Sequence, residues 1–186
     1  MIIEQRAIEG ITVFEKFLNF ENFRNLNDSI LNSFFKIGWG EAKRHQDVTP
    51  SMYLGCIHSS WSEQDIENNN IPTILETTKA KELINGRKPV QCYINVSHPG
   101  DTYLHHCHIG FDVLLIYFNI AWKREWAGET LFYDKQTEDL IFACEPKENR
   151  AVYFEGDFPH VMRPTSYLAP KFRLSMTLLF KREKNS

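Results

Sequence analysis

The chain has 186 residues, of which 42% are hydrophobic and 13% aromatic. This length suits one domain with a full hydrophobic core, and the composition excludes intrinsic disorder. A net charge of −3 gives no reason to expect nucleic acid or an anionic membrane as a partner. No basic segment followed by an apolar run opens the chain, and no apolar run approaches membrane length, so we expect a cytoplasmic protein.

Residues 1–88 have a helical pattern. Apolar residues recur at three- and four-residue spacing between Phe14 and Phe35, as an amphipathic helix requires, with Asn25 or Asp28 as its cap. A second helix is predicted over Ile71–Ile84, with Pro72 in its first turn. We therefore expect this part to form a helical buttress that also shapes the substrate side of the molecule.

From Pro89 onward the pattern changes to short strands separated by turn residues. These strands behind N-terminal helices predict a mainly β fold, namely a double-stranded β-helix or jelly-roll (cupin-like) barrel over residues 89–182 of a single domain spanning 1–186. A β-sandwich of another topology would give the same pattern. The eight predicted strands are Val90–Ser97, Asp101–His108, Asp112–Ile120, Thr130–Asp134, Leu140–Glu145, Arg150–Phe154, His160–Thr165 and Phe172–Phe180.

The four cysteines are far apart in the sequence and form no CxxC pair. Three of them, Cys92, Cys107 and Cys144, lie in apolar, strand-like runs, whereas Cys56 does not. Buried free thiols are therefore the expected state of those three cysteines.

Three histidines form a candidate metal site. His106 and His108 are two residues apart, so their side chains share one face of an extended strand, while His105 and Cys107 point to the other. A third histidine from a distant strand, His160, would complete a three-ligand site with open positions. Such an incomplete ligand set is typical of a catalytic metal rather than a structural one.

Arg173 is a candidate anchor for a carboxylate co-substrate. It lies thirteen residues after His160, and Ser175 two residues on shares its strand face. A guanidinium group held inside a barrel needs an anionic partner, and a carboxylate matches its fork geometry.

Several motifs occur in a fixed order between Pro89 and Phe180, which is half of the chain. Together they resemble the prolyl 4-hydroxylase-like branch of the non-haem Fe(II)/2-oxoglutarate-dependent dioxygenases. The motifs are Pro99-Gly100, Tyr103 three residues before His106, His106-Cys107-His108, Ile116-Tyr117-Phe118-Asn119, Trp126-Ala127-Gly128-Glu129-Thr130, Phe154 five residues before Pro159-His160, and Arg173-Leu174-Ser175.

This resemblance implies Fe(II) as the metal of the histidine site and 2-oxoglutarate as the ligand of Arg173, with ascorbate as an optional reductant. Tyr117, Thr130 and Ser175 would contribute hydrogen bonds to the co-substrate, with Thr177 as a further candidate. In such an enzyme, O2 and 2-oxoglutarate are consumed, succinate and CO2 are formed, and a small-molecule or peptidyl substrate is oxidised, most often by hydroxylation.

The chain departs from the family at one ligand. His108 occupies the position at which the family has a carboxylate. Three interpretations stay open. The site could be a three-histidine facial site for Fe(II), Asp112 could fold back as the acidic ligand, or the site could have lost its redox chemistry.

Two other functions compete with an oxygenase that uses 2-oxoglutarate. One is a non-catalytic jelly-roll module that binds a metal or small ligand, or docks a partner. The other is a three-histidine dioxygenase that needs no 2-oxoglutarate, against which Arg173-Leu174-Ser175 argues. His45 and His58 have no motif around them, and we expect both at the surface.

Overall fold

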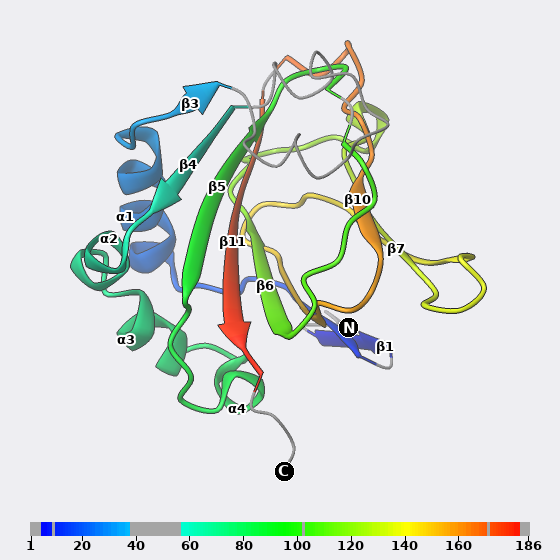
Figure 1. The fold of residues 1–186 in the computed structure, drawn as a ribbon. Coiled ribbons are helices and arrows are strands. Elements are labelled where there is room, and N and C mark those ends of the chain that lie inside the picture. Colours follow the sequence, from blue (N-terminus) through cyan, green and yellow to red (C-terminus); the bar gives the residue numbers. More distant parts are fainter. Residues whose placement is uncertain (1–4, 9, 38–56, 102, 171, 183–186) are drawn as a thin grey trace.

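The computed structural model describes residues 5–8, 10–37, 57–101, 103–170 and 172–182 (Figure 1). Two antiparallel sheets dominate it. The larger has eight strands in the order β1-β2-β9-β6-β11-β5-β4-β3, and the smaller has three in the order β10-β7-β8. The strands are β1 (Gln5–Ile8), β2 (Ile11–Phe14), β3 (Lys36–Ile37), β4 (Ile57–Trp61), β5 (Gln91–Ser97), β6 (Phe111–Tyr117), β7 (Thr130–Tyr133), β8 (Leu140–Cys144), β9 (Ala151–Glu155), β10 (His160–Met162) and β11 (Arg173–Lys181).

The helices cover one face of the large sheet, and the small sheet lies over the other (Figure 1). The helices of this layer are α1 (Phe20–Leu31), α2 (Glu63–Asn68), α3 (Ile71–Glu76) and α4 (Lys81–Ile84). The 3-10 helix η3 (Arg124–Trp126) shortly precedes β7 of the small sheet. Among the described residues, none of these helices is long and apolar enough to cross a membrane.

Alternation along the central strands divides the core into two apolar clusters. On β6, Leu114 and Ile116 pack in the helix-side cluster with residues of α1 such as Leu26. Val113 and Leu115, on the opposite face of the same strand, belong to the cluster between the two sheets. This period of two also applies to β11, so Arg173, Ser175 and Thr177 are directed toward the small sheet.

The predicted fold class, mainly β with N-terminal helices and jelly-roll-like, is confirmed. The two sheets face each other without closing into a continuous barrel. The part before residue 89 also contributes four strands to the large sheet, β1 to β4, which its helical pattern did not predict.

The two predicted helices are both shorter in the structure. α1 begins after Asn19, whose side chain accepts a hydrogen bond of 2.8 Å from the backbone of Asn22. The capping positions predicted from the sequence were therefore wrong. Phe14 pairs with Ala151 of β9 instead of opening the helix. The second predicted helix is divided into α3 and α4, and it stops at Asn85, which adopts the left-handed conformation.

Seven of the eight predicted strands are present, but Asp101–His108 is not a strand. Of its described residues, only His106 forms a β-bridge, an isolated one to His160 of the small sheet. Two residues later, the backbone N–H of His108 donates to the carbonyl of Gly156, which follows β9 of the large sheet. The segment thus crosses from one sheet to the other and cannot run along either.

The structure describes three of the four cysteines, and all three are free thiols. Cys92 and Cys144 are buried as predicted, and burial raises the pKa of Cys144 to about 11. Cys107 is exposed, so its predicted burial was wrong. Cys56 and His45 lie outside the described residues.

Candidate metal centre and co-substrate pocket

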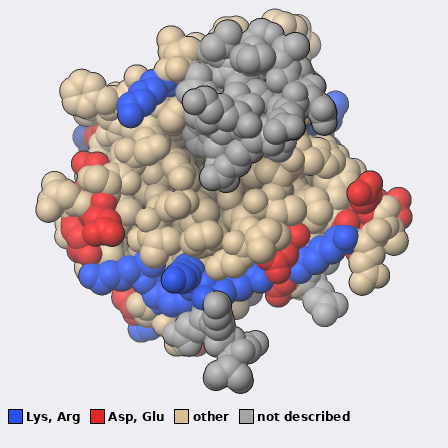
Figure 2. All heavy atoms as spheres, viewed as in Figure 1, with Lys and Arg blue, Asp and Glu red and all other residues tan. Residues whose placement is uncertain are grey.

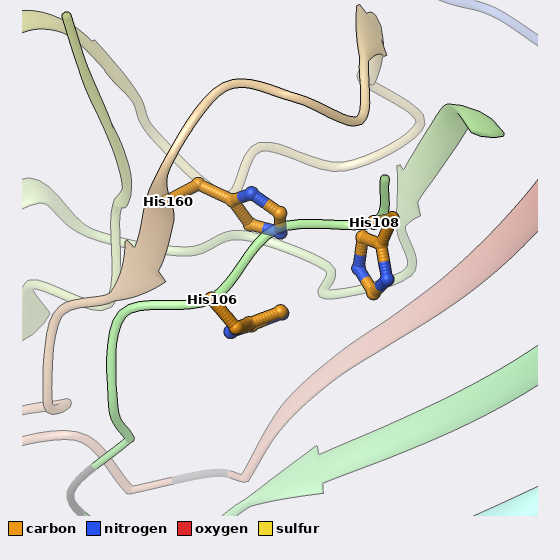
Figure 3. Close-up of side chains that lie close together, drawn as sticks. All are labelled: His106, His108 and His160. Atoms are coloured by element: carbon orange, nitrogen blue, oxygen red, sulfur yellow. The ribbon is translucent and has the colours of Figure 1, made fainter. Parts of the chain in front are cut away.

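The structure brings His106, His108 and His160 together, and their rings surround a common space (Figure 3). One ligand nitrogen from each lies within 4.8 Å of the other two. The ring centroids are 4.3 Å apart for His106 and His160, 5.0 Å for His106 and His108, and 5.2 Å for His108 and His160. His160 is buried, His108 is half-buried and His106 is exposed, so the space they share opens toward solvent on one side.

Backbone hydrogen bonds hold the two most distant ligands side by side. His106 and His160 exchange two N–H to carbonyl bonds of 3.1 Å each, although 54 positions separate them in the sequence. Their Nδ1 atoms lie 3.1 Å from the carbonyl of Leu104 and 2.9 Å from that of Phe158, respectively. With Nδ1 protonated and donating to these carbonyls, Nε2 carries the lone pair that a metal requires.

The surroundings of His108 and His160 favour the neutral form of these two imidazoles. Burial, together with the neighbouring His106, lowers the pKa of His108 to about 4. Burial also lowers the pKa of His160 well below its ordinary range, and His106 adds to the effect. Neutral imidazole is the form that binds metal ions, and three such nitrogens suit Fe(II), zinc or copper. The donor set therefore fits a divalent metal ion.

Asp112 does not lie in the histidine cluster. Its carboxylate accepts hydrogen bonds from Arg182 at 2.6 Å, Arg87 at 2.7 Å and the hydroxyl of Tyr153 at 2.8 Å. Partial burial would raise its pKa, but the hydrogen bonds from Arg182, Arg87 and Tyr153 outweigh this effect, and the pKa is lowered. The carboxylate is committed to these groups, so folding back as a ligand, as considered from the sequence, does not occur.

A cavity of about 170 Å³ adjoins the three histidines. It extends between the two sheets to Arg173 on β11, and Thr130, Ser175 and Thr177 line it on the way. Figure 2 shows the molecular surface in the orientation of Figure 1. The centre of this face is largely uncharged, and Lys and Arg lie along its lower part together with some Asp and Glu. The structure thus joins the predicted metal site and the predicted anion anchor in one cavity.

Arg173 is 3% exposed, and neutral groups hold it. Its Nε donates to the carbonyl of Gly128 at 2.7 Å, and its terminal nitrogens donate to Ser175 at 3.2 Å and Thr130 at 3.0 Å. Its guanidinium carbon also lies 5.1 Å from the centre of the Tyr117 ring. Within the part of the chain that the structure describes, no carboxylate lies within ion-pair distance of it. A buried cation for which the described residues provide no counter-ion is a candidate site for an anion.

Tyr117 contacts both Arg173 and Thr130. It is fully buried, and its hydroxyl lies 2.8 Å from the hydroxyl of Thr130. Burial raises the pKa of Tyr117, which favours the protonated phenol. It does not line the cavity, so it reaches a ligand through Thr130 and Arg173.

The sequence analysis missed a polar wall of the cavity, formed by Gln91, Tyr93 and Asn95 on β5 and His58 on β4. His58 was predicted at the surface, but it is half-buried and lines the cavity. In the sheet it pairs with Asn95, which in turn pairs with Ser175. The signal for β5 was in the sequence, since its polar residues alternate with Cys92, Ile94 and Val96 over residues 91–97.

Four other histidine and tryptophan residues close to the motifs in the sequence lie outside the cavity. His105 is exposed beside Tyr133, with ring centroids 4.4 Å apart. His98 is exposed and contacts the ring of Phe172. Trp122 and Trp126 pack edge to face against each other at 5.3 Å. These aromatic side chains have packing contacts in the structure and do not line the candidate site.

No family model matches the chain, and a search of curated proteins returns no match. Solved structures do match. A prolyl-4-hydroxylase from Pseudomonas putida has a TM-score of 0.68 at 19% identity, covering 93% of each chain. A prolyl hydroxylase from Trichoplax adhaerens, in complex with a peptide fragment of the hypoxia inducible factor oxygen degradation domain, has a TM-score of 0.67 at 15% identity, covering 92% of this chain and 83% of its own. A 2OG-Fe(II) oxygenase family protein from Burkholderia pseudomallei has a TM-score of 0.68 at 9% identity, covering 94% and 85%. The chain therefore has the fold of the prolyl-4-hydroxylase-like 2OG-Fe(II) oxygenases.

Proposed function

We propose that this protein is an Fe(II)- and 2-oxoglutarate-dependent oxygenase that hydroxylates its substrate. The metal would be held by His106, His108 and His160, and the far carboxylate of 2-oxoglutarate by Arg173. One observation carries the proposal, namely that a single cavity joins three converging imidazoles to a buried arginine for which the described residues provide no counter-ion. The fold of the neighbouring structures agrees with it.

When bound, Fe(II) would supply, together with O2 and 2-oxoglutarate, the oxidising power for hydroxylation, with succinate and CO2 as by-products. The protein itself would bind and orient the metal, the co-substrate and the substrate, and shield them from solvent. Arg173 is preorganised for its part, because three hydrogen bonds to Gly128, Thr130 and Ser175 already fix its guanidinium group. A carboxylate that enters the cavity then meets an oriented cation, and little further ordering is needed.

The third histidine changes the charge of the site. A divalent metal with three neutral imidazoles is one unit more positive than the same metal with two imidazoles and a carboxylate. The two carboxylates of 2-oxoglutarate bring negative charge to the cavity, so the co-substrate itself compensates for the missing acidic ligand. We expect co-substrate and metal to bind with strong positive coupling.

The primary substrate, a peptidyl group or a small molecule, would reach the metal past the polar wall of Gln91, Tyr93 and Asn95. This wall offers amide and hydroxyl groups, and no Asp, Glu or Lys side chain lines the cavity among the described residues. A neutral, hydrogen-bonding part of the substrate fits such a surface. The Trichoplax neighbour is described with a peptide, which supports the peptidyl alternative.

The proposed function predicts a visible metal-to-ligand charge-transfer band when Fe(II) and 2-oxoglutarate are added together without O2. Neither component alone should produce the band, because it requires the oxo acid to contact the metal. Admission of O2 should then bleach it and release succinate. If 2-oxoglutarate binds equally well without metal and no band forms, the chain is a ligand-binding module rather than an oxygenase.

A second prediction concerns the substituted ligand. Replacing His108 with Asp restores the family's carboxylate, yet we expect Fe(II) affinity and succinate formation to fall by about 10-fold or more. The reason is reach. The backbone of His108 is fixed by its 2.6 Å hydrogen bond to Gly156, and the shorter Asp side chain stops before the point at which the imidazoles converge.

His105→Asp is the matched control, because it makes the same chemical change one residue outside the cluster, on an exposed side chain. It should leave Fe(II) binding and succinate formation unchanged. Both variants and the parent are compared at the same Fe(II) concentration. An inactive parent together with an active His108→Asp variant would show that the native chain is not an oxygenase.

A further inference from the structure

Gly156 lies against the backbone of His108, and we propose that it is a positioning residue for the metal centre. In this role, which rests on the proposed function, its lack of a side chain seats His108 so that the imidazole converges with His106 and His160. Gly156 is buried at the end of β9, one residue beyond the last residue of that strand.

Backbone bonds tie the two residues together. The N–H of His108 donates to the carbonyl of Gly156 at 2.6 Å. The N–H of Gly156 donates to the carbonyl of Phe111 at 2.9 Å, and the N–H of Phe111 donates back to the carbonyl of His108 at 3.0 Å. These bonds extend the ladder between β6 and β9 past its last registered pair, Asp112 and Glu155. The large sheet thereby determines where His108 stands.

A side chain at position 156 would not fit. An added Cβ would overlap the carbonyl oxygen of His108 and would lie 2.6 Å from the carbonyl oxygen of Phe111 and 2.9 Å from Cβ of His108. Two of these three atoms are backbone oxygens that already belong to the hydrogen-bonded ladder. Backbone oxygens cannot rotate away as the end of a flexible side chain can, so the backbone of His108 itself has to move.

The requirement for glycine here is one of space. Gly156 is not among the glycines with positive φ, so an alanine would meet no conformational penalty of the left-handed region. Gly110, in the turn between His108 and Phe111, is the opposite case. Its φ is +83°, and an added Cβ there meets no heavy atom within 4 Å. An alanine at position 156 therefore tests steric overlap with His108, whereas an alanine at position 110 tests backbone strain alone.

The other two ligands do not depend on Gly156. His106 and His160 hold each other through their two backbone bonds at the edge of the small sheet. The metal centre thus has two ligands placed by the small sheet and one placed by the large sheet. Gly156 sets the distance between these two parts, and a methyl group there would displace one ligand of three.

The test is Co(II) binding to metal-free protein, followed by the visible spectrum of the bound ion. Gly156→Ala is expected to weaken Co(II) binding by about 10- to 100-fold, the usual effect of losing support for a ligand. Its spectrum should also change, since one nitrogen donor is withdrawn. Gly110→Ala should lower the melting temperature yet keep the parent's Co(II) affinity within about 3-fold. Equal affinity of Gly156→Ala and parent, or an equal loss in Gly110→Ala, would overturn the inference.

A double-mutant cycle shows whether Gly156 acts through His108. In the His108→Ala background the third ligand is already absent, so adding Gly156→Ala should cause no further loss of Co(II) affinity. A general destabilisation of the site would instead give losses that multiply. If the parent itself does not bind Co(II), the proposed function fails, and this result differs from a parent that binds while Gly156→Ala binds equally well.

If Gly156→Ala lacks a cooperative unfolding transition, the proposal is tested by amide exchange on the parent protein. Zn(II) binding is then expected to slow amide exchange at His108 and Gly156, because ordering the imidazole also orders the bonded backbone. Slower exchange at His106 and His160 without any change at His108 and Gly156 would contradict the proposal.

Discussion

Replacing Arg173 with Ala is expected to weaken 2-oxoglutarate binding by about 2–5 kcal/mol, the usual loss when one member of a buried charge pair is truncated. This corresponds to an increase of roughly 30-fold to several thousandfold in Kd. The loss should be large because Arg173 is 3% exposed and no described carboxylate competes for it. Arg173→Lys should recover only part of the affinity, since an ammonium group cannot bind a carboxylate through two parallel hydrogen bonds.

The measurement is calorimetric titration of 2-oxoglutarate into the metal-loaded protein without O2. The matched control is Arg163→Ala. Arg163 directly follows β10, three residues after His160, but its side chain is 58% exposed and pairs with Glu129 at 3.5 Å. Unchanged co-substrate affinity in Arg173→Ala would disprove the anchor, whereas equal losses in both variants would indicate a non-specific effect of positive charge.

Replacing Asp112 with Ala should destabilise the protein by about 2–3 kcal/mol at neutral pH. Breaking a buried pair costs about 3–5 kcal/mol, and water that reaches the edge of this cluster reduces the value. Arg87 loses its ion pair with Asp112, whereas Arg182 keeps a second ion pair with Asp157 at 2.7 Å. For a chain of this length, the melting temperature should fall by roughly 4–12 °C.

The sign of the pH dependence follows from the lowered pKa of Asp112. An aspartate has a pKa of about 3.9 in the unfolded chain, and the folded value lies below it. The stabilisation is therefore fully present above that unfolded value, and it is lost as the pH falls through the folded pKa. The difference between parent and variant should accordingly shrink below about pH 4.

Thermal unfolding from pH 3 to pH 8 tests this prediction, with the exposed Asp139→Ala as the control that should match the parent throughout. Since Asp112 lies outside the histidine cluster, Co(II) affinity should be unchanged in Asp112→Ala once it is folded. A loss of Co(II) affinity comparable with that of a triad variant would restore Asp112 as a ligand candidate.

Local sequence patterns were sufficient for the parts of this protein that depend on neighbours along the chain. Alternation over residues 173–177 placed Arg173 and Ser175 on one strand face, and the structure puts both in the cavity. The spacing of His106 and His108 predicted a shared direction, and the two rings do converge with His160. Seven predicted strands are present because they are short apolar or alternating runs separated by turn residues, and such runs are a local property of the sequence.

Only the tertiary structure decided the features that depend on distant partners. The sequence left Asp112 open as a ligand, but in the structure its carboxylate binds Arg87 and Arg182. Neither arginine is near Asp112 in the sequence. His58 became part of the cavity because β4 pairs with β5, an arrangement that no local pattern around His58 indicates. Gly156 is at an unspecified position between Phe154 and Pro159, and its proposed role comes from how closely it approaches the backbone of His108. Periodicity along the chain shows which way a side chain points, whereas pairing between distant strands determines what it meets there.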